Sequence, residues 1–213
     1  MAAASGLAET PGRLENVFLN PDNSLSPNGI YGVNLYTLGV KHTVIVDDWL
    51  PLYGNSTLFA HLSDDGGIWG SILEKAFSKY HGNYEHTIGG DPSYAVRTLT
   101  GYPREIFSHG NTDDEALWTK IQNHHAEDII TSGTPYSSGG HDDSNAQGLA
   151  MTHAYTLIGS AVLSDGTRLI QMRNPWGSEG WFGDWSDESD KWTDAFKAEV
   201  AADPHVTEYK NDK

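Results

Sequence analysis

Two stretches, Thr152-His153-Ala154-Tyr155 and Arg173-Asn174-Pro175-Trp176-Gly177, decide the fold of this chain. Apolar-rich segments follow the first and precede the second, and the turn sequence Ser164-Asp165-Gly166-Thr167 lies between them. Asp-Gly between apolar runs favours a tight reversal, because glycine accepts the positive φ that such a turn needs. We therefore expect a β-hairpin, whose imperfect apolar alternation leaves the register open.

The functional interest of this hairpin is its open end. His153 stands at the start of the first strand and Asn174 just past the end of the second, so the fold would bring them side by side. An Asn amide oxygen can accept from one ring N–H and fix the tautomer and orientation of the imidazole. The other ring nitrogen would then act as a base towards a nucleophile, while Trp176 shields the hydrogen bond from water.

These motifs resemble those of the calpain-type cysteine endopeptidases, a branch of the papain-like fold. The resemblance continues along the chain in family order and covers most of it. The further matching segments are Val46-Asp47-Asp48-Trp49-Leu50-Pro51, Trp69 through Ala76 (WGSILEKA), Tyr84-Glu85 with Gly89-Gly90, and the tryptophan- and acid-rich run from Trp181 to Asp187. A single His-Ala-Tyr would be a weak signal, whereas the ordered set is specific.

The resemblance implies an α+β fold, namely a papain-like calpain protease core. Residues 1–100 would form the remainder of a partly helical first catalytic subdomain. Residues 101–213 would form a second subdomain, rich in antiparallel β-structure, that carries the His and the Asn. The expected boundary lies near Gly101, where the sequence pattern loosens.

One expected residue is absent, because the chain contains no cysteine. In the family the nucleophile lies in a Gly-Asp-Cys segment that opens a helix of small residues. Met1 to Ala8 resembles the continuation of that helix, so the chain is expected to begin just after the position of the cysteine. The oxyanion-stabilising glutamine of the family would be missing too, and the chain alone is expected to be inactive.

In an intact relative, a thiol would give its proton to the imidazole that matches His153. The resulting thiolate would attack a peptide carbonyl, while the residue that matches Asn174 orients the ring. The resemblance also implies calcium as a cofactor, with one carboxylate at Glu85 and another at Asp187. Both sites would be incomplete here, since calcium takes six to eight oxygen ligands.

Composition narrows the classes of partner. The net charge of −16 argues against non-specific binding of nucleic acid, which requires Lys and Arg to neutralise phosphates. No apolar run approaches the length of about 18 residues that a membrane span needs, and no signal peptide is visible. We expect a cytoplasmic protein with a protein or peptide substrate; the oligomeric state is left open.

Local patterns predict several further elements. An Ala-rich helix is expected over residues 2–10, a strand pair over 30–38 and 42–46, and an amphipathic helix from Trp69 that ends at Gly82. Thr112 to Glu115 reads as a capping box that starts another helix. Residues 134–149 are polar and glycine-rich, which predicts a mobile surface loop. Its position just ahead of His153 suggests a lid over the substrate groove.

Two alternatives stay open. A non-catalytic calpain-like module would bind a protein partner or peptide, and the absence of cysteine is consistent with it. A carbohydrate-binding β protein would use stacked aromatic rings, and the seven tryptophans permit it. Exposed, clustered tryptophans would favour the carbohydrate hypothesis, whereas Trp176 and Trp185 buried beside His153 would count against it.

Overall fold

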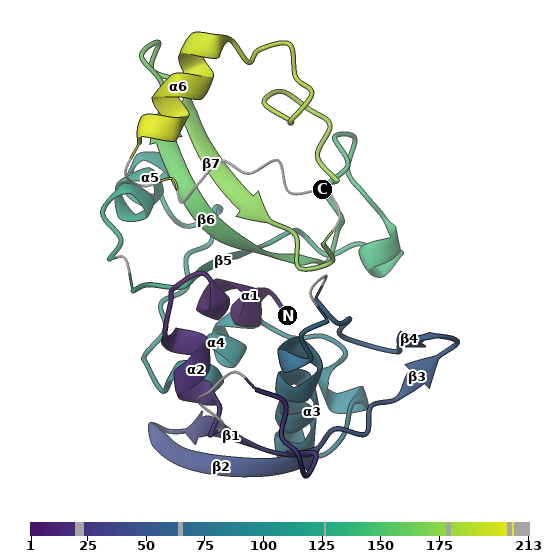
Figure 1. The fold of residues 1–213 in the computed structure, drawn as a ribbon. Helices are drawn as coiled ribbons and strands as arrows, with labels where there is room; N and C mark the ends of the chain where they lie inside the picture. Colours follow the sequence, from purple (N-terminus) through teal and green to yellow (C-terminus); the bar gives the residue numbers. More distant parts are fainter. Residues whose placement is uncertain (20–23, 64–65, 126, 178–179, 204–205, 207–213) are drawn as a thin grey trace. The chain divides into compact units, whose positions relative to one another are not determined.

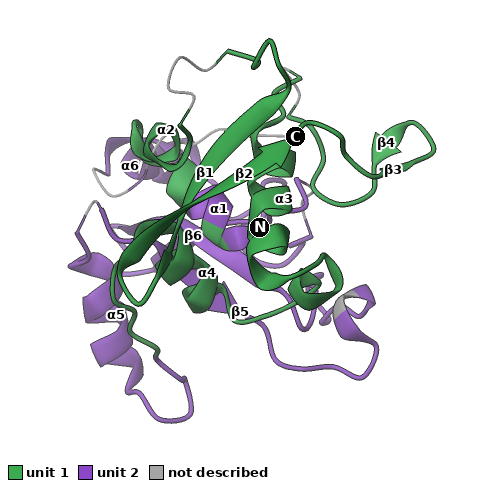
Figure 2. Ribbon diagram, turned by 90° about the horizontal axis from the view of Figure 1, so that it is seen from below, with its two compact units in different colours: residues 1, 3, 7–106 green, residues 2, 4–6, 107–213 purple. Residues whose placement is uncertain are grey.

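A computed structural model describes the chain except residues 20–23, 64–65, 126, 178–179, 204–205 and 207–213. It divides into two compact units, one made of residues 1, 3 and 7–106 and the other of residues 2, 4–6 and 107–213 (Figure 2). Helices and antiparallel strand pairs occur in both units, so the fold is α+β, as expected. The division follows Ile106, and the subdomain assignment itself stays a prediction.

The first unit is built on a long hairpin. Strand β1 (Ile30–Thr37) pairs with β2 (Val40–Asp47) in continuous antiparallel register. Helix α3 (Trp69–His81) packs beside this hairpin and donates from Lys79 Nζ to the Ile45 carbonyl at 2.7 Å. Its apolar stripe is buried, and it ends at Gly82, which has a φ of 110°. The predicted hairpin and helix are both confirmed.

Smaller elements complete this unit (Figure 1). They are α2 (Arg13–Val17), β3 (Leu52–Tyr53), β4 (Ser56–Thr57), the 3₁₀ turn η1 (Glu85–Thr87) and α4 (Pro92–Thr100). The sequence analysis did not anticipate α4. Its start signals are nevertheless present, since Asp91 caps it by accepting from the Ser93 N–H at 2.8 Å and Pro92 occupies its first turn.

Helix α1 (Ala2–Ala8) forms where the Ala-rich N-terminal segment predicted it. Gly6 is required on one face of this helix, because a Cβ there would lie 2.6 Å from Ile129 Cγ2. At the same place, the buried Thr156 hydroxyl donates to the Ala2 carbonyl at 2.6 Å. Ala2 and Gly6 belong to the second unit, and the lack of a side chain at Gly6 allows this close approach within it.

That sheet has three antiparallel strands in the order β5 (Ile130–Gly133), β6 (Ala154–Val162) and β7 (Arg168–Arg173). Helix α6 (Asp194–Ala202) contributes Val200 to a core with Ala161 and Leu163. The β6–β7 hairpin is thus confirmed, and Gly166 in its turn has a φ of 88°. Its register shifts between Leu157 and Gly159, which explains the imperfect apolar alternation.

Helix α5 (Asp114–Gln122) corrects one detail of the prediction. Its N-cap is Asp113, whose carboxylate accepts from the Ala116 N–H at 3.1 Å, and not Thr112. Glu115 instead pairs with Arg168 on β7, at 2.6 Å between Oε2 and Nη2. The predicted capping box is therefore wrong, because the aspartate provides the cap and the glutamate takes a tertiary partner.

Candidate active site

The hairpin of the second unit brings His153 and Asn174 together. His153 immediately precedes β6 and Asn174 immediately follows β7, so the antiparallel pairing of these strands places both at one end. The His153 Nε2 and Asn174 Oδ1 atoms lie 2.9 Å apart. The predicted contact is therefore confirmed, while the catalytic roles of the two residues stay predictions.

A second hydrogen bond shows which atom donates and which accepts in the contact between His153 and Asn174. The Trp176 N–H donates to the same Asn174 Oδ1 at 3.1 Å. A backbone N–H can only donate, so the Asn174 atom between the two groups must be the oxygen. The imidazole therefore donates from Nε2, and the neutral ring carries no proton on Nδ1. Nδ1 is the nitrogen with the chemistry of a base.

Two aromatic rings border the imidazole. The Trp176 ring lies 4.1 Å from it between centroids, and the Tyr155 ring meets it edge-on at 4.9 Å. Burial raises the pKa of Tyr155, whose hydroxyl accepts from the Ala150 N–H. Trp176 is 49% exposed, so it covers one side of the His–Asn pair and keeps another face in solvent.

Two further tryptophans, Trp185 and Trp192, pack in the core beside α6 and do not form an exposed platform. Trp185 packs edge-on against Trp192 at 4.9 Å and against Phe196 at 5.7 Å, beside the buried residues of the α6 core. These rings serve packing in that core, and the described contacts of Trp185 do not include His153. Of Trp176 and Trp185, whose burial beside His153 would count against carbohydrate binding, only Trp176 contacts His153, and it is 49% exposed.

The residues that hold the backbone ahead of His153 were not among the predicted site residues. Thr134 is the first residue of the loop predicted over residues 134–149, directly after β5, and its hydroxyl accepts from the His153 N–H at 2.9 Å. Thr152 adopts a φ of 50°, which is rare for a β-branched residue. No local sequence pattern marks the role of Thr134, because it depends on the pairing of β5 with β6.

The loop between Thr134 and Leu149 has more structure than its composition suggested. It contains the 3₁₀ turn η2 (Gly140–Asp142), and Ser144 bridges to Ala150. The Asn145 carboxamide accepts from the N–H groups of Gln147 and Leu149, at 3.0 and 2.9 Å. Its role as a lid stays a prediction.

The two calcium candidates lie in different units. Glu85 is exposed in η1, and Asp187 is half-buried in the loop that follows β7. Among the described residues, no three His, Asp or Glu side chains come close enough together to hold a metal ion. Nearby, Asp184 is already paired with Lys191 at 2.8 Å. Within the part of the chain that the structure describes, neither Glu85 nor Asp187 thus belongs to a group of three such side chains that could hold a metal ion.

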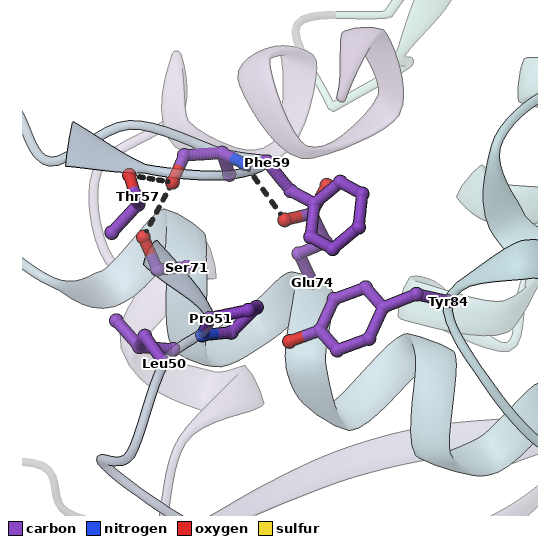
Figure 3. A pocket seen from close by; sticks show the side chains of 8 residues that line it. Leu50, Pro51, Thr57, Phe59, Ser71, Glu74 and Tyr84 are labelled. Carbon is purple, nitrogen blue, oxygen red and sulfur yellow. Dashed lines mark hydrogen bonds between the residues drawn. The ribbon is translucent and has the colours of Figure 1, made fainter. Parts of the chain in front are cut away.

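The first unit contains a small pocket (Figure 3). Its volume is about 10 Å³, roughly the room for one water molecule, and Phe59 and Tyr84 stack across it at 4.5 Å. Glu74 accepts from the Ala60 N–H at 2.8 Å, and burial raises the pKa of its carboxyl. The pocket is too small for a peptide side chain, so we assign it to packing.

None of the helices in the described part of the chain is both long and apolar enough to cross a membrane.

Comparison with known proteins finds relatives of the calpain type. The chain is 34% identical over 208 residues to the calpain-type cysteine protease DEK1 of Zea mays, which covers 93% of the chain and 9% of that protein. It is 30% identical over 197 residues to calpain-12 of Homo sapiens, covering 90% of the chain and 27% of that relative. The chain thus spans about a tenth of the plant relative and about a quarter of the human one.

The family model described as calpain family cysteine protease matches residues 1–208. This range includes both units and the hairpin that joins His153 to Asn174. The chain therefore belongs to the calpain family of cysteine proteases.

Proposed function

We propose that this chain supplies the general base and its orienting residue to a calpain-type cysteine endopeptidase that cleaves proteins or peptides in the cytoplasm. The observation that carries the proposal is the hydrogen bond from His153 Nε2 to Asn174 Oδ1. The Trp176 N–H holds the same oxygen, so the carboxamide is fixed independently of the ring. Fixed orientation of the base is what general-base catalysis requires.

In the proposed reaction, His153 Nδ1 takes the proton of a cysteine thiol. The thiolate attacks the peptide carbonyl, a C–S bond forms, and the imidazolium returns its proton to the leaving amine. Water, deprotonated by the same nitrogen, then cleaves the acyl-enzyme. Asn174 keeps Nε2–H in place throughout, so Nδ1 is always the nitrogen that exchanges the proton. The 213 residues contain no cysteine, so the thiol must come from outside them.

Calcium dependence belongs to the same proposal. We propose Glu85 and Asp187 as single carboxylate contributions to sites that need further oxygen ligands. On this view, calcium changes the activity only when the missing ligands are present. The net charge of −16 supports attraction of cations and disfavours nucleic acid as a partner.

The test joins to Met1 a calpain-family segment that carries the glutamine and the Gly-Asp-Cys motif. The unfused chain should leave casein intact, and the fusion should cleave it in a calcium-dependent manner. His153→Ala should reduce the rate of the fusion about 10²- to 10⁴-fold, the range for a lost general base. Asn174→Ala should reduce it about 10- to 100-fold, as for the loss of an orienting partner.

The matched control is His109→Ala, which removes an exposed histidine of the same unit and should leave cleavage unchanged. Cleavage by the unfused chain that survives His153→Ala would contradict the proposal.

The absence of cysteine favours a second candidate, a calpain-like module that binds a protein partner or peptide without cleaving it. An inactive fusion, together with saturable binding of a labelled casein peptide to the chain in fluorescence anisotropy, would favour this module.

A further inference from the structure

The backbone that leads into His153 is held in an unusual conformation. Thr152 has a φ of 50°, and a β-branched side chain in that region costs about 1 kcal/mol or more. Neighbouring groups maintain it: the Thr152 N–H donates to the Pro135 carbonyl at 2.9 Å, and its hydroxyl accepts from the Ser137 N–H at 2.8 Å. Strain beside a candidate catalytic residue indicates that the surroundings fix the position of that residue.

Thr134 lies opposite His153, directly after the end of β5. Along β5 and β6 the register is regular as far as Gly133 and Ala154, so the next opposed residues are Thr134 and His153. The Thr134 N–H donates to the His153 carbonyl at 2.9 Å, which continues the ladder. The return bond is made by a side chain, since the His153 N–H donates to Thr134 Oγ1 at 2.9 Å.

The Thr134 hydroxyl also donates a hydrogen bond of its own. A threonine hydroxyl has one proton to donate and lone pairs that accept. Thr134 Oγ1 lies 2.8 Å from the Ala150 carbonyl and 3.2 Å from the His153 carbonyl. The His153 carbonyl already receives the Thr134 N–H, so Ala150 is the better acceptor. The hydroxyl thus accepts from His153 and donates to Ala150 at once.

Ala150 is held at its other polar group as well. Its N–H donates to Tyr155 Oη at 3.0 Å, and the residue is only 7% exposed. The tight turn from Ala150 to His153 is therefore anchored at its start by Thr134 and Tyr155 and at its end by Thr134. One side chain, Thr134, contacts both ends.

From this geometry we propose that Thr134 is a positioning residue for His153. By fixing the His153 backbone on the β5 side, it allows the imidazole to meet Asn174, which β7 presents on the other side. The orientation of the His153 ring then depends on β5, β6 and β7 together. Its relevance to catalysis rests on the proposed function, whereas the effect of Thr134 on the ring can be measured without catalysis.

The experiment uses the 213-residue chain itself, labelled with ¹⁵N. Wild-type His153 should give the ring-nitrogen chemical shifts of a single Nε2–H tautomer above pH 8. Thr134→Val keeps the size of the side chain and removes the hydroxyl. It should move these shifts towards the average of two tautomers, and it should speed hydrogen exchange of the His153 amide at least tenfold. Thr134→Ser should restore both signals.

Thr131→Val is the matched control. It makes the same substitution three residues earlier on the same segment, and no hydrogen bond of the Thr131 hydroxyl is found among the described residues. It should leave the ring shifts and the His153 amide unchanged. If Thr134→Val does not fold, Thr134→Ala replaces it, with the same expectations.

Wild-type ring shifts in a folded variant without the Thr134 hydroxyl would overturn the proposal. The same holds if Thr131→Val changes the His153 signals as much as Thr134→Val does. Failure of the proposed function would look different: the wild-type ring would keep its single tautomer and its response to Thr134, while the fusion with the cysteine segment would stay inactive.

Discussion

The two long hairpins of this chain have similar strands and very different open ends. In the first unit, β1–β2 ends at Asp47, an exposed carboxylate that Lys75 Nζ of α3 contacts at 2.5 Å. In the second, β6–β7 ends at a half-buried imidazole and carboxamide beside Trp176. The first end is fixed by an ion pair in contact with solvent, and the second by side-chain hydrogen bonds and aromatic rings. A hairpin alone brings two ends together; its neighbours decide whether those ends can do chemistry.

The strands of the two hairpins are alike in burial, because each hairpin pairs a buried strand with a more exposed one. Residues 31–35 of β1 are all buried, and Leu35 is fully enclosed. On β7, Ile170 is 52% exposed, so one face of that strand remains open to solvent. Each hairpin therefore joins an inner strand to an outer one, since β2 exposes Ile45 and β6 buries Thr156 and Ser160.

The largest expected effect tests the difference in burial between the inner strand β1 and the outer strand β7. Leu35→Ala should lower the free energy of unfolding by about 2–5 kcal/mol, because it removes a fully buried side chain and leaves a cavity. Ile170→Ala, the matched variant on β7, should cost less than about 1 kcal/mol, since half of its side chain is already in water. Urea unfolding followed by circular dichroism measures both, and equal losses would remove the distinction.

An intermediate effect tests what the hairpins share. Gly39 and Gly166 have φ values of 81° and 88° in their turns, and a Cβ at either position would meet no atom within 4 Å. Gly39→Ala and Gly166→Ala should therefore each destabilise by about 1 kcal/mol, from backbone strain alone. Thermal unfolding should show similar decreases. A loss at Gly166 several times that at Gly39 would mean that the second turn has a constraint not visible in its geometry.

The smallest effect concerns the ionic end. The hydrogen bond from Lys75 holds the pKa of Asp47 below its usual value of 3.8. This contribution to stability is present above that value and is lost as the pH falls through the lower folded-state pKa. Lys75→Met should slightly lower the melting temperature at pH 7 and flatten its dependence on pH below 4.

Lys191→Met, which removes another exposed ion pair, is the matched control for the loss of a surface charge. If the melting temperatures of Lys75→Met and of the wild type depend equally strongly on pH below 4, the ion pair does not contribute to stability.

Much of this molecule follows from the sequence alone. Asp165-Gly166 between apolar runs determined the second hairpin, and its two ends determined that His153 meets Asn174. The apolar stripe of α3 and the glycine at its end gave that helix its bounds. These features are local, or depend on one reversal of the chain, so residue type and spacing are enough to predict them.

Only the tertiary structure decided how His153 and Asn174 are held in place. Thr134 lies far from His153 along the chain, and its role depends on β5 pairing with β6. The cap of α5 and the pairing of Glu115 with Arg168 depend in the same way on which elements become neighbours. A hydroxyl or carboxylate has several possible partners, and its choice is fixed by distances that arise only when separate segments pack together.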